Sequence, residues 1–203
     1  MDTLLAGYRR FRANGWPTQK KAFERLAAAG QSPKTLVLAC VDSRVDPAMI
    51  FDTAPGEVLT VRNVANLVPP YAPDAAHHST SAALEFGVRV LGVQHVMVLG
   101  HGSCGGVKAL LDGAPKEANE FVAPWMSIAE TARLRAMKHA KPEDRQQFCE
   151  HEVIRVSLEN LLTFPWIAER VAAGKLQLHG AWFAIHSGRL LLRQPDGSFT
   201  APE

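Results

Sequence analysis

The chain has 203 residues, of which 47% are hydrophobic and 21% charged, and its formal net charge is +2. This length suits a single domain, residues 1–203, with a sizeable core. Charges of both signs are interspersed, which argues against a nucleic-acid-binding face. No apolar run approaches the roughly 18–20 residues of a membrane span, and residues 1–10 lack the apolar segment of a secretory signal, so none is expected. The three cysteines, an odd number, argue against a disulfide framework and favour a reducing, cytoplasmic location.

Helical spacing of apolar residues marks the start of the chain and several later segments. Residues 1–30 are predicted to form an N-terminal helical arm that Gly30 ends. A later helix is expected to begin with Ser79 or Thr80 as its cap. Further helices are expected at 105–111, about 117–140, about 143–162 and 165–173.

Short apolar runs between these helices are typical of buried parallel strands. The expected strands lie at 35–39, 58–61, 95–100, 176–179 continued by 181–185, and 189–192. The last follows a tight turn at Ser187-Gly188 and is expected to be antiparallel. The alternation predicts the α/β class. The central sheet is expected to be mostly parallel, in the order 2-1-3-4, with an antiparallel edge strand 5 and flanking helices.

Two short strings of reactive residues follow the first and third strands: Cys40-Val41-Asp42-Ser43-Arg44 and His101-Gly102-Ser103-Cys104. Sites in open α/β sheets form at the carboxyl ends of strands, where the strand order reverses. The order 2-1-3 would therefore bring these two strings together. Two thiols and one imidazole make a three-ligand zinc set with a free fourth position, the layout of a catalytic site.

Less specific interpretations of the same strings also exist. A single buried cysteine is usually a small apolar filler, and a glycine-rich turn from strand to helix can cradle a phosphate. The second string lacks the Lys-Ser/Thr ending of a P-loop. The helix expected after Cys104 would favour a thiolate there.

At these strings the chain resembles the β-class carbonic anhydrases, in their plant-like subtype. Similarity extends from about residue 5 to 195 and includes the segments 30–34, 55–57, 61–70 and 157–162. The resemblance implies one Zn²⁺ per chain, bound by Cys40, His101 and Cys104. It implies reversible hydration of carbon dioxide to bicarbonate and a proton, by attack of zinc-bound hydroxide.

The resemblance also assigns roles around the metal. It implies an Asp42–Arg44 dyad and a substrate-side amide from Gln31. Asp42 would orient the nucleophile, Arg44 would keep Asp42 ionised, and Gln31 would donate to the oxygen that gains charge. The substrate pocket is expected to include Leu59, Val64, Phe86 and Gly105. Phe86 and Leu59 stand where plant-type members often carry tyrosine and phenylalanine, so one hydroxyl is lost.

Position 37 bears on the state of the zinc. Some family members have a closed form in which the aspartate ligates the metal, aided by a tryptophan three residues before the first cysteine and an arginine in the second strand. Here those positions hold Val37 and Arg62. We therefore expect Asp42 to pair with Arg44 and water to occupy the fourth position.

The same residues leave two alternative functions open, and the chain is expected to form an oligomer. The same site could hydrolyse carbonyl sulfide or carbon disulfide, or the chain could be a non-catalytic zinc-binding protein with Asp42 as the fourth ligand. The apolar helices of the arm and the edge hairpin favour a homodimer or tetramer, with the arm packed on a partner subunit.

Overall fold

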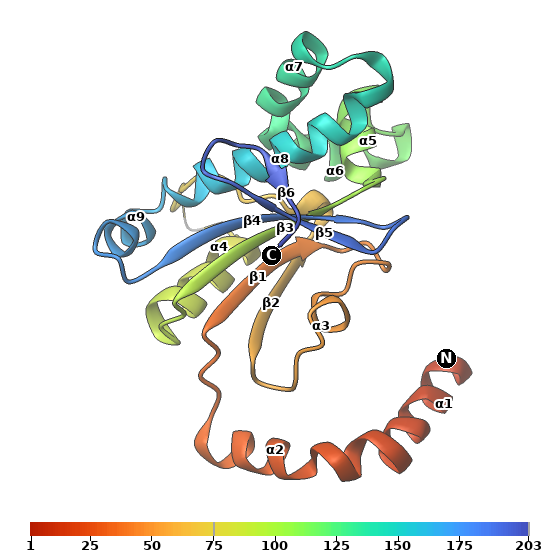
Figure 1. The fold of residues 1–203 in the computed structure, drawn as a ribbon, viewed down its shortest axis with the longest axis vertical. Helices are drawn as coiled ribbons and strands as arrows, with labels where there is room; N and C mark the ends of the chain where they lie inside the picture. Colours follow the sequence, from red (N-terminus) through yellow and green to blue (C-terminus); the bar gives the residue numbers. More distant parts are fainter. Residues whose placement is uncertain (75, 203) are drawn as a thin grey trace.

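The computed structural model describes residues 1–74 and 76–202, and their strands form one six-stranded sheet in the order β2-β1-β3-β4-β5-β6 (Figure 1). The strands are β1 (Thr35–Cys40), β2 (Val58–Asn63), β3 (His95–His101), β4 (Gln177–Ala184), β5 (Arg189–Arg193) and β6 (Phe199–Thr200). The first four are parallel, and β5 and β6 are antiparallel. The expected class and order are confirmed, with the short β6 added outside β5.

Helices cover the sheet, and the first two helices precede β1 and stand away from it (Figure 1). The α-helices are α1 (Asp2–Arg10), α2 (Trp16–Ala29), α3 (Pro47–Ile50), α4 (Ser79–Glu85), α5 (Gly105–Asp112), α6 (Val122–Met126), α7 (Glu130–His139), α8 (Arg145–Leu161) and α9 (Pro165–Ala172). Single π-helical turns, Phe11–Gly15 and Phe86–Val90, follow α1 and α4. In the described part of the chain, no helix is long and apolar enough to span a membrane.

The prediction of one long helix at about 117–140 is wrong. The chain instead forms the short α6 and the separate α7, preceded and joined by single 3₁₀ turns. Pro124 explains why no helix runs from about residue 117 through this segment, because a proline inside a helix has no N–H to donate and clashes with the preceding turn. Starting α6 at Val122 places Pro124 in the first turn, where that N–H is not needed.

Two other local expectations are corrected. Ser79 and Thr80 lie inside α4, and His78 occupies the N-cap position. The hydroxyl of Thr80 instead accepts a hydrogen bond from the Asn63 side chain at 3.2 Å. The helix α3 was not expected, although its signal is present: the Asp46 carboxylate accepts from the N–H of Ala48, and a proline follows Asp46 directly.

The helix α8 packs across β3 and β4. Two strand glycines allow this close packing. A Cβ at Gly100 would lie 2.7 Å from Ile154 Cδ1, and one at Gly180 would lie 2.9 Å from Ile154 Cγ2. Both distances are too short for real carbon contacts, so the glycines set how closely α8 approaches the sheet.

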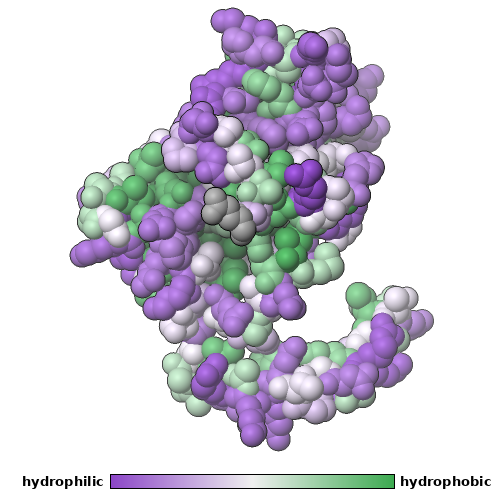
Figure 2. All heavy atoms as spheres, viewed as in Figure 1, coloured by the Kyte–Doolittle hydropathy of each residue, from purple (hydrophilic) through white to green (hydrophobic). Residues whose placement is uncertain are grey.

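The first two helices form an arm that stands away from the sheet (Figures 1 and 2). Every residue of this arm is at least partly exposed. Its exposed apolar side chains include Leu4 (73% exposed), Tyr8 (58%) and Phe11 (36%). Large apolar side chains in this number are typical of a surface that another chain covers.

Candidate metal centre

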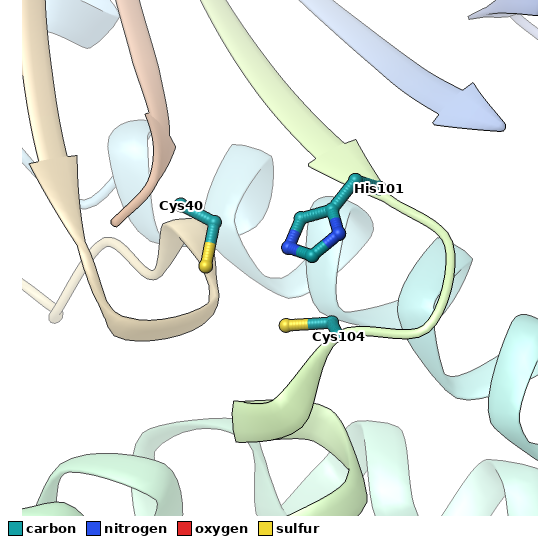
Figure 3. Close-up of side chains that lie close together, drawn as sticks. All are labelled: Cys40, His101 and Cys104. Carbon is teal, nitrogen blue, oxygen red and sulfur yellow. The ribbon is translucent and has the colours of Figure 1, made fainter. Parts of the chain in front are cut away.

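Cys40, His101 and Cys104 meet at the carboxyl edge of the sheet, as the sequence predicted. Cys40 ends β1, His101 ends the neighbouring β3, and Cys104 precedes α5. Each offers one ligand atom, and these atoms all lie within 4.8 Å of one another. All three residues are at least 96% buried, and their side chains face one another (Figure 3).

The hydrogen bonds of His101 leave one ring nitrogen free for a metal. Nδ1 lies 2.9 Å from the carbonyl oxygen of Gly102 and therefore carries the proton that it donates. Nε2 is buried and has no hydrogen-bond partner among the described residues. A buried nitrogen without a partner, beside two sulfur atoms, fits a metal ligand.

The two cysteine sulfurs shift each other's pKa in opposite directions. The neighbouring Cys104 thiol, helped by His101 and by the N–H groups of Asp42 and Ala65, lowers the pKa of Cys40 against the effect of burial. The pKa of Cys104 is raised, chiefly by the nearby Cys40 sulfur and by burial. The expected helix-terminus effect on Cys104 is present, since N–H groups at the start of α5 lower its pKa, but the Cys40 sulfur and burial outweigh it.

Electrostatics at His101 follow from the same pair. Burial acts to lower the pKa of His101, but the nearby Cys40 sulfur and the Gly102 carbonyl oxygen raise it overall. The cluster therefore concentrates negative charge on sulfur at the place where a cation would bind.

Asp42 and Arg44 form a tight ion pair beside the cluster. Arg44 donates from Nε to Asp42 Oδ1 at 2.9 Å and from its terminal nitrogen to Oδ2 at 2.7 Å. The backbone N–H of Arg44 also donates to Oδ1. These hydrogen bonds hold the pKa of Asp42 well below its usual range. Both carboxylate oxygens are thus engaged by Arg44, and Asp42 stays ionised.

Arg62 braces the backbone that carries Cys40 and Asp42. Its guanidinium donates to the carbonyl oxygens of Cys40 at 2.9 Å and Asp42 at 2.6 Å, and it forms a salt bridge with Asp46 at 3.0 Å. In this chain Arg62 is therefore occupied by its own loop. Val37 lies in the core at 2% exposure.

The structure brings two of the expected pocket residues to the cluster. Gly105 directly follows Cys104 at the start of α5. Val64 packs against Gly106, the residue after Gly105, because a Cβ at Gly106 would be 2.8 Å from Val64 Cγ1. The Trp125 indole donates to the carbonyl oxygen of Val64 at 2.8 Å and fixes this wall.

Gln31, Leu59 and Phe86 lie at the opposite, amino edge of the sheet. Gln31 precedes β1, and Leu59 is paired with Leu36 near the start of that strand. Phe86 adjoins Gly87, which packs on the same two leucines. Cys40 lies four positions beyond Leu36 along β1, a length of about 13 Å. Within one chain these three residues do not join the metal ligands.

A buried carboxylate that was not expected from the sequence lies next to the backbone of Cys104. Glu150 is 3% exposed, and its oxygens accept from the Cys104 backbone, Gln146 and Trp182. Burial raises its pKa, against the effect of these hydrogen bonds. A signal was present, because Glu150 shares the helical face of the buried residues Val153, Ile154, Ser157 and Leu161.

Comparison with known proteins assigns the class. The family model described as carbonic anhydrase matches residues 35–190. β-Carbonic anhydrase 3 of Arabidopsis thaliana is 37% identical over 202 residues, covering 97% of this chain and 78% of that protein. A carbonic anhydrase of Pseudomonas aeruginosa is 38% identical, covering 94% of this chain and 86% of that protein.

Solved structures agree with this assignment. The β-carbonic anhydrase CcaA superposes with a TM-score of 0.92 at 33% identity, covering 100% of this chain and 99% of that one. A tetrameric β-carbonic anhydrase from Sordaria macrospora gives a TM-score of 0.74 at 28% identity, covering 98% and 95%. The chain belongs to the β-carbonic anhydrase family. It is an enzyme of that class, with a small-molecule substrate.

Proposed function

We propose that the chain is a zinc enzyme that reversibly hydrates carbon dioxide to bicarbonate and a proton. The observation that carries this proposal is the buried Cys40–His101–Cys104 cluster beside the Asp42–Arg44 ion pair. Two thiolate sulfurs and one imidazole nitrogen suit zinc better than the hard cations, which prefer oxygen ligands. The free Nε2 of His101 fits the same role.

Zinc bound there would supply Lewis acidity, which makes water acidic enough to react near neutral pH. Asp42 is ionised, so it can accept a hydrogen bond from the attacking water. This hydrogen bond would point a lone pair of the water oxygen at carbon dioxide. Arg44 holds the carboxylate in that orientation. Val64 supplies an apolar wall that suits a substrate without a net dipole.

The engagement of both Asp42 oxygens by Arg44 supports an open fourth position on the metal. A non-catalytic zinc protein with Asp42 as its fourth ligand would require this ion pair to break. No observation favours carbonyl sulfide or carbon disulfide over carbon dioxide.

The test combines metal content with carbon dioxide hydration. We expect one zinc per chain, and we expect Cys40→Ser and Cys104→Ser to lose both zinc and activity. Cys149→Ser is the matched control, since Cys149 is equally buried but lies outside the cluster. Full hydration activity in metal-free protein would contradict the proposal.

We also propose that a second copy of the chain completes each active site. Gln31, Leu59 and Phe86 lie too far from Cys40 to act within one chain, and Phe86 is 46% exposed. The apolar arm that leads into Gln31 is uncovered and suits packing on that copy. The tetrameric relative from Sordaria macrospora agrees with an oligomer of two or four chains.

Mixed oligomers test this arrangement. One chain carries Cys40→Ser and the other Gln31→Ala, and the two are co-expressed with different tags and purified together. If Gln31 acts across the interface, one site per mixed dimer has all its native residues and activity returns. If Gln31 acts within its own chain, the mixture stays as impaired as the two parents.

We place the enzyme in the cytoplasm. All three cysteines are buried and unpaired among the described residues, which suits a reducing compartment. Fractionation of cells that express the tagged chain checks this placement, and enrichment in another compartment would contradict it.

A further inference from the structure

We propose that Glu150 and Gln146, one turn apart on α8, clamp the backbone of Cys104 and thereby position its sulfur for the metal. This inference rests on the zinc site proposed above. It concerns residues that do not ligate the metal themselves, so they act through Cys104.

The clamp holds both polar groups of the Cys104 backbone. Glu150 Oε1 accepts from the Cys104 N–H at 3.0 Å, and Gln146 Nε2 donates to the Cys104 carbonyl oxygen at 3.1 Å. Gln146 Nε2 also donates to Glu150 Oε1 at 2.8 Å, which ties the two side chains together. The Trp182 indole donates to the other Glu150 oxygen at 3.1 Å. Every donor to Glu150 is neutral.

The segment that the clamp holds is under conformational strain. Ser103, directly before Cys104, has a φ of 55°, which L-residues other than glycine adopt infrequently. The ring of Trp182 packs against the same turn, because a Cβ at Gly102 would lie 3.1 Å from its Cζ2. Without the clamp, the turn could relax and move the Cys104 sulfur away from Cys40 and His101.

A carboxyl group at this place is also unusual for a protein core. Burying it among neutral donors is costly, and an apolar side chain could fill the same space. The carboxyl group nevertheless lies where it accepts a hydrogen bond from the N–H of Cys104. Its position therefore assigns Glu150 to the candidate metal centre rather than to the core.

The test measures how fast zinc is transferred from the purified holoenzyme to a coloured chelator. We expect Glu150→Gln, Glu150→Ala and Gln146→Ala to speed this transfer by about 10- to 100-fold. The matched control is Glu152→Gln, because Glu152 is a half-buried carboxylate on the same helix that pairs with Arg135 and Arg155 instead of the Cys104 backbone. Its transfer rate should stay within about twofold of the unsubstituted enzyme.

Two further measurements separate positioning from general stability. The visible spectrum of the cobalt-substituted protein should change in the clamp variants and stay unchanged in Glu152→Gln. The urea concentration at which half of each metal-free variant is unfolded measures destabilisation separately. If Glu150→Ala does not fold, Gln146→Ala provides the test of the clamp. Unchanged transfer rates and spectra in folded clamp variants would overturn this inference alone. An unsubstituted protein that retains no zinc would overturn the proposed function as well.

Discussion

At the scale of single residues, the Asp42–Arg44 pair is where charge and geometry bear most directly on the reaction. Arg44 is half exposed, yet it fixes Asp42 through three hydrogen bonds. An amide at position 42 would keep the shape but lose the charge that makes it a strong acceptor. The residue is therefore expected to affect turnover rather than metal content.

Asp42→Asn should lower the turnover of carbon dioxide hydration by about 10²- to 10⁴-fold, the usual contribution of a positioned acid–base group. Zinc content should remain one per chain. Asp112→Asn, which breaks the exposed pair with Lys108, is the control and should leave turnover unchanged. Normal turnover in Asp42→Asn would show that Asp42 has no role in the proposed reaction.

His151 gives a second residue-scale prediction, for acid stability. Its ring stacks on Phe199 at 4.0 Å between ring centres, and burial lowers its pKa to about 4. A histidine in the unfolded chain titrates near 6.5. Between about pH 6.5 and 4 the unfolded state therefore binds the proton first, so stability falls as the pH falls, by at most about 1.4 kcal/mol per pH unit.

His151→Phe keeps the stacked ring and removes this titration. We expect the free energy of unfolding in urea to lose less between pH 7 and pH 5 in the variant than in the unsubstituted protein. The exposed His186→Phe is the control and should show the unsubstituted pH dependence. Parallel pH profiles for His151→Phe and the unsubstituted protein would contradict the prediction.

At the scale of elements, the fit of α8 onto the sheet connects packing with the metal centre. The same helix contributes Ile154 to the core and Glu150 to the turn that carries Cys104. Gly180 on β4 lets the helix lie close, since a Cβ there would meet Ile154 and Leu158 side chains. A shift of α8 would therefore also disturb the clamp.

Gly180→Ala should lower the free energy of unfolding by about 1–3 kcal/mol through overcrowding. Ile154→Ala should cost about 2–5 kcal/mol through the cavity it leaves. Because the added methyl group enters space that Ile154 vacates, the double variant should be less destabilised than the sum of the two. Urea titrations of all four proteins measure this, and strict additivity would show that the two sites do not contact.

At the scale of the whole molecule, the exposed arm and the proposed division of the substrate pocket both agree with the proposed oligomer. The arm exposes apolar side chains, and the body leaves Gln31 and Phe86 at the edge away from Cys40. Figure 2 shows the open space between arm and body that another chain can enter. Activity should accordingly depend on association.

Leu4→Glu combined with Tyr8→Glu places two charges on one face of α1, because residues four apart are neighbours on a helix. We expect sedimentation equilibrium to show monomers that retain zinc but lose most hydration activity. The control is Leu134→Glu on α7, an exposed leucine outside the arm. A fully active monomer would contradict the shared site.

Much of the fold and of the metal centre followed from local sequence, for physical reasons. Apolar runs at the expected spacing identified the strands that became β1 to β5, and the reversal between strands one and three placed Cys40 near His101. The start of α6 at Val122 was open to the same reasoning, since a proline is tolerated in the first turn of a helix but not in its interior.

Other properties were decided only by tertiary structure, because they depend on distance rather than on order in the chain. The opposite pKa shifts of Cys40 and Cys104 require both sulfurs to lie side by side. So does the contact of Glu150 with a backbone N–H far away in sequence. The order of Cys40, His101 and Cys104 along the chain was thus enough to predict the cluster, because Cys40 and His101 end neighbouring strands and Cys104 follows His101 by three residues. The position of Gln31 at the opposite edge of the sheet is visible only in the folded structure, because it depends on distance across β1.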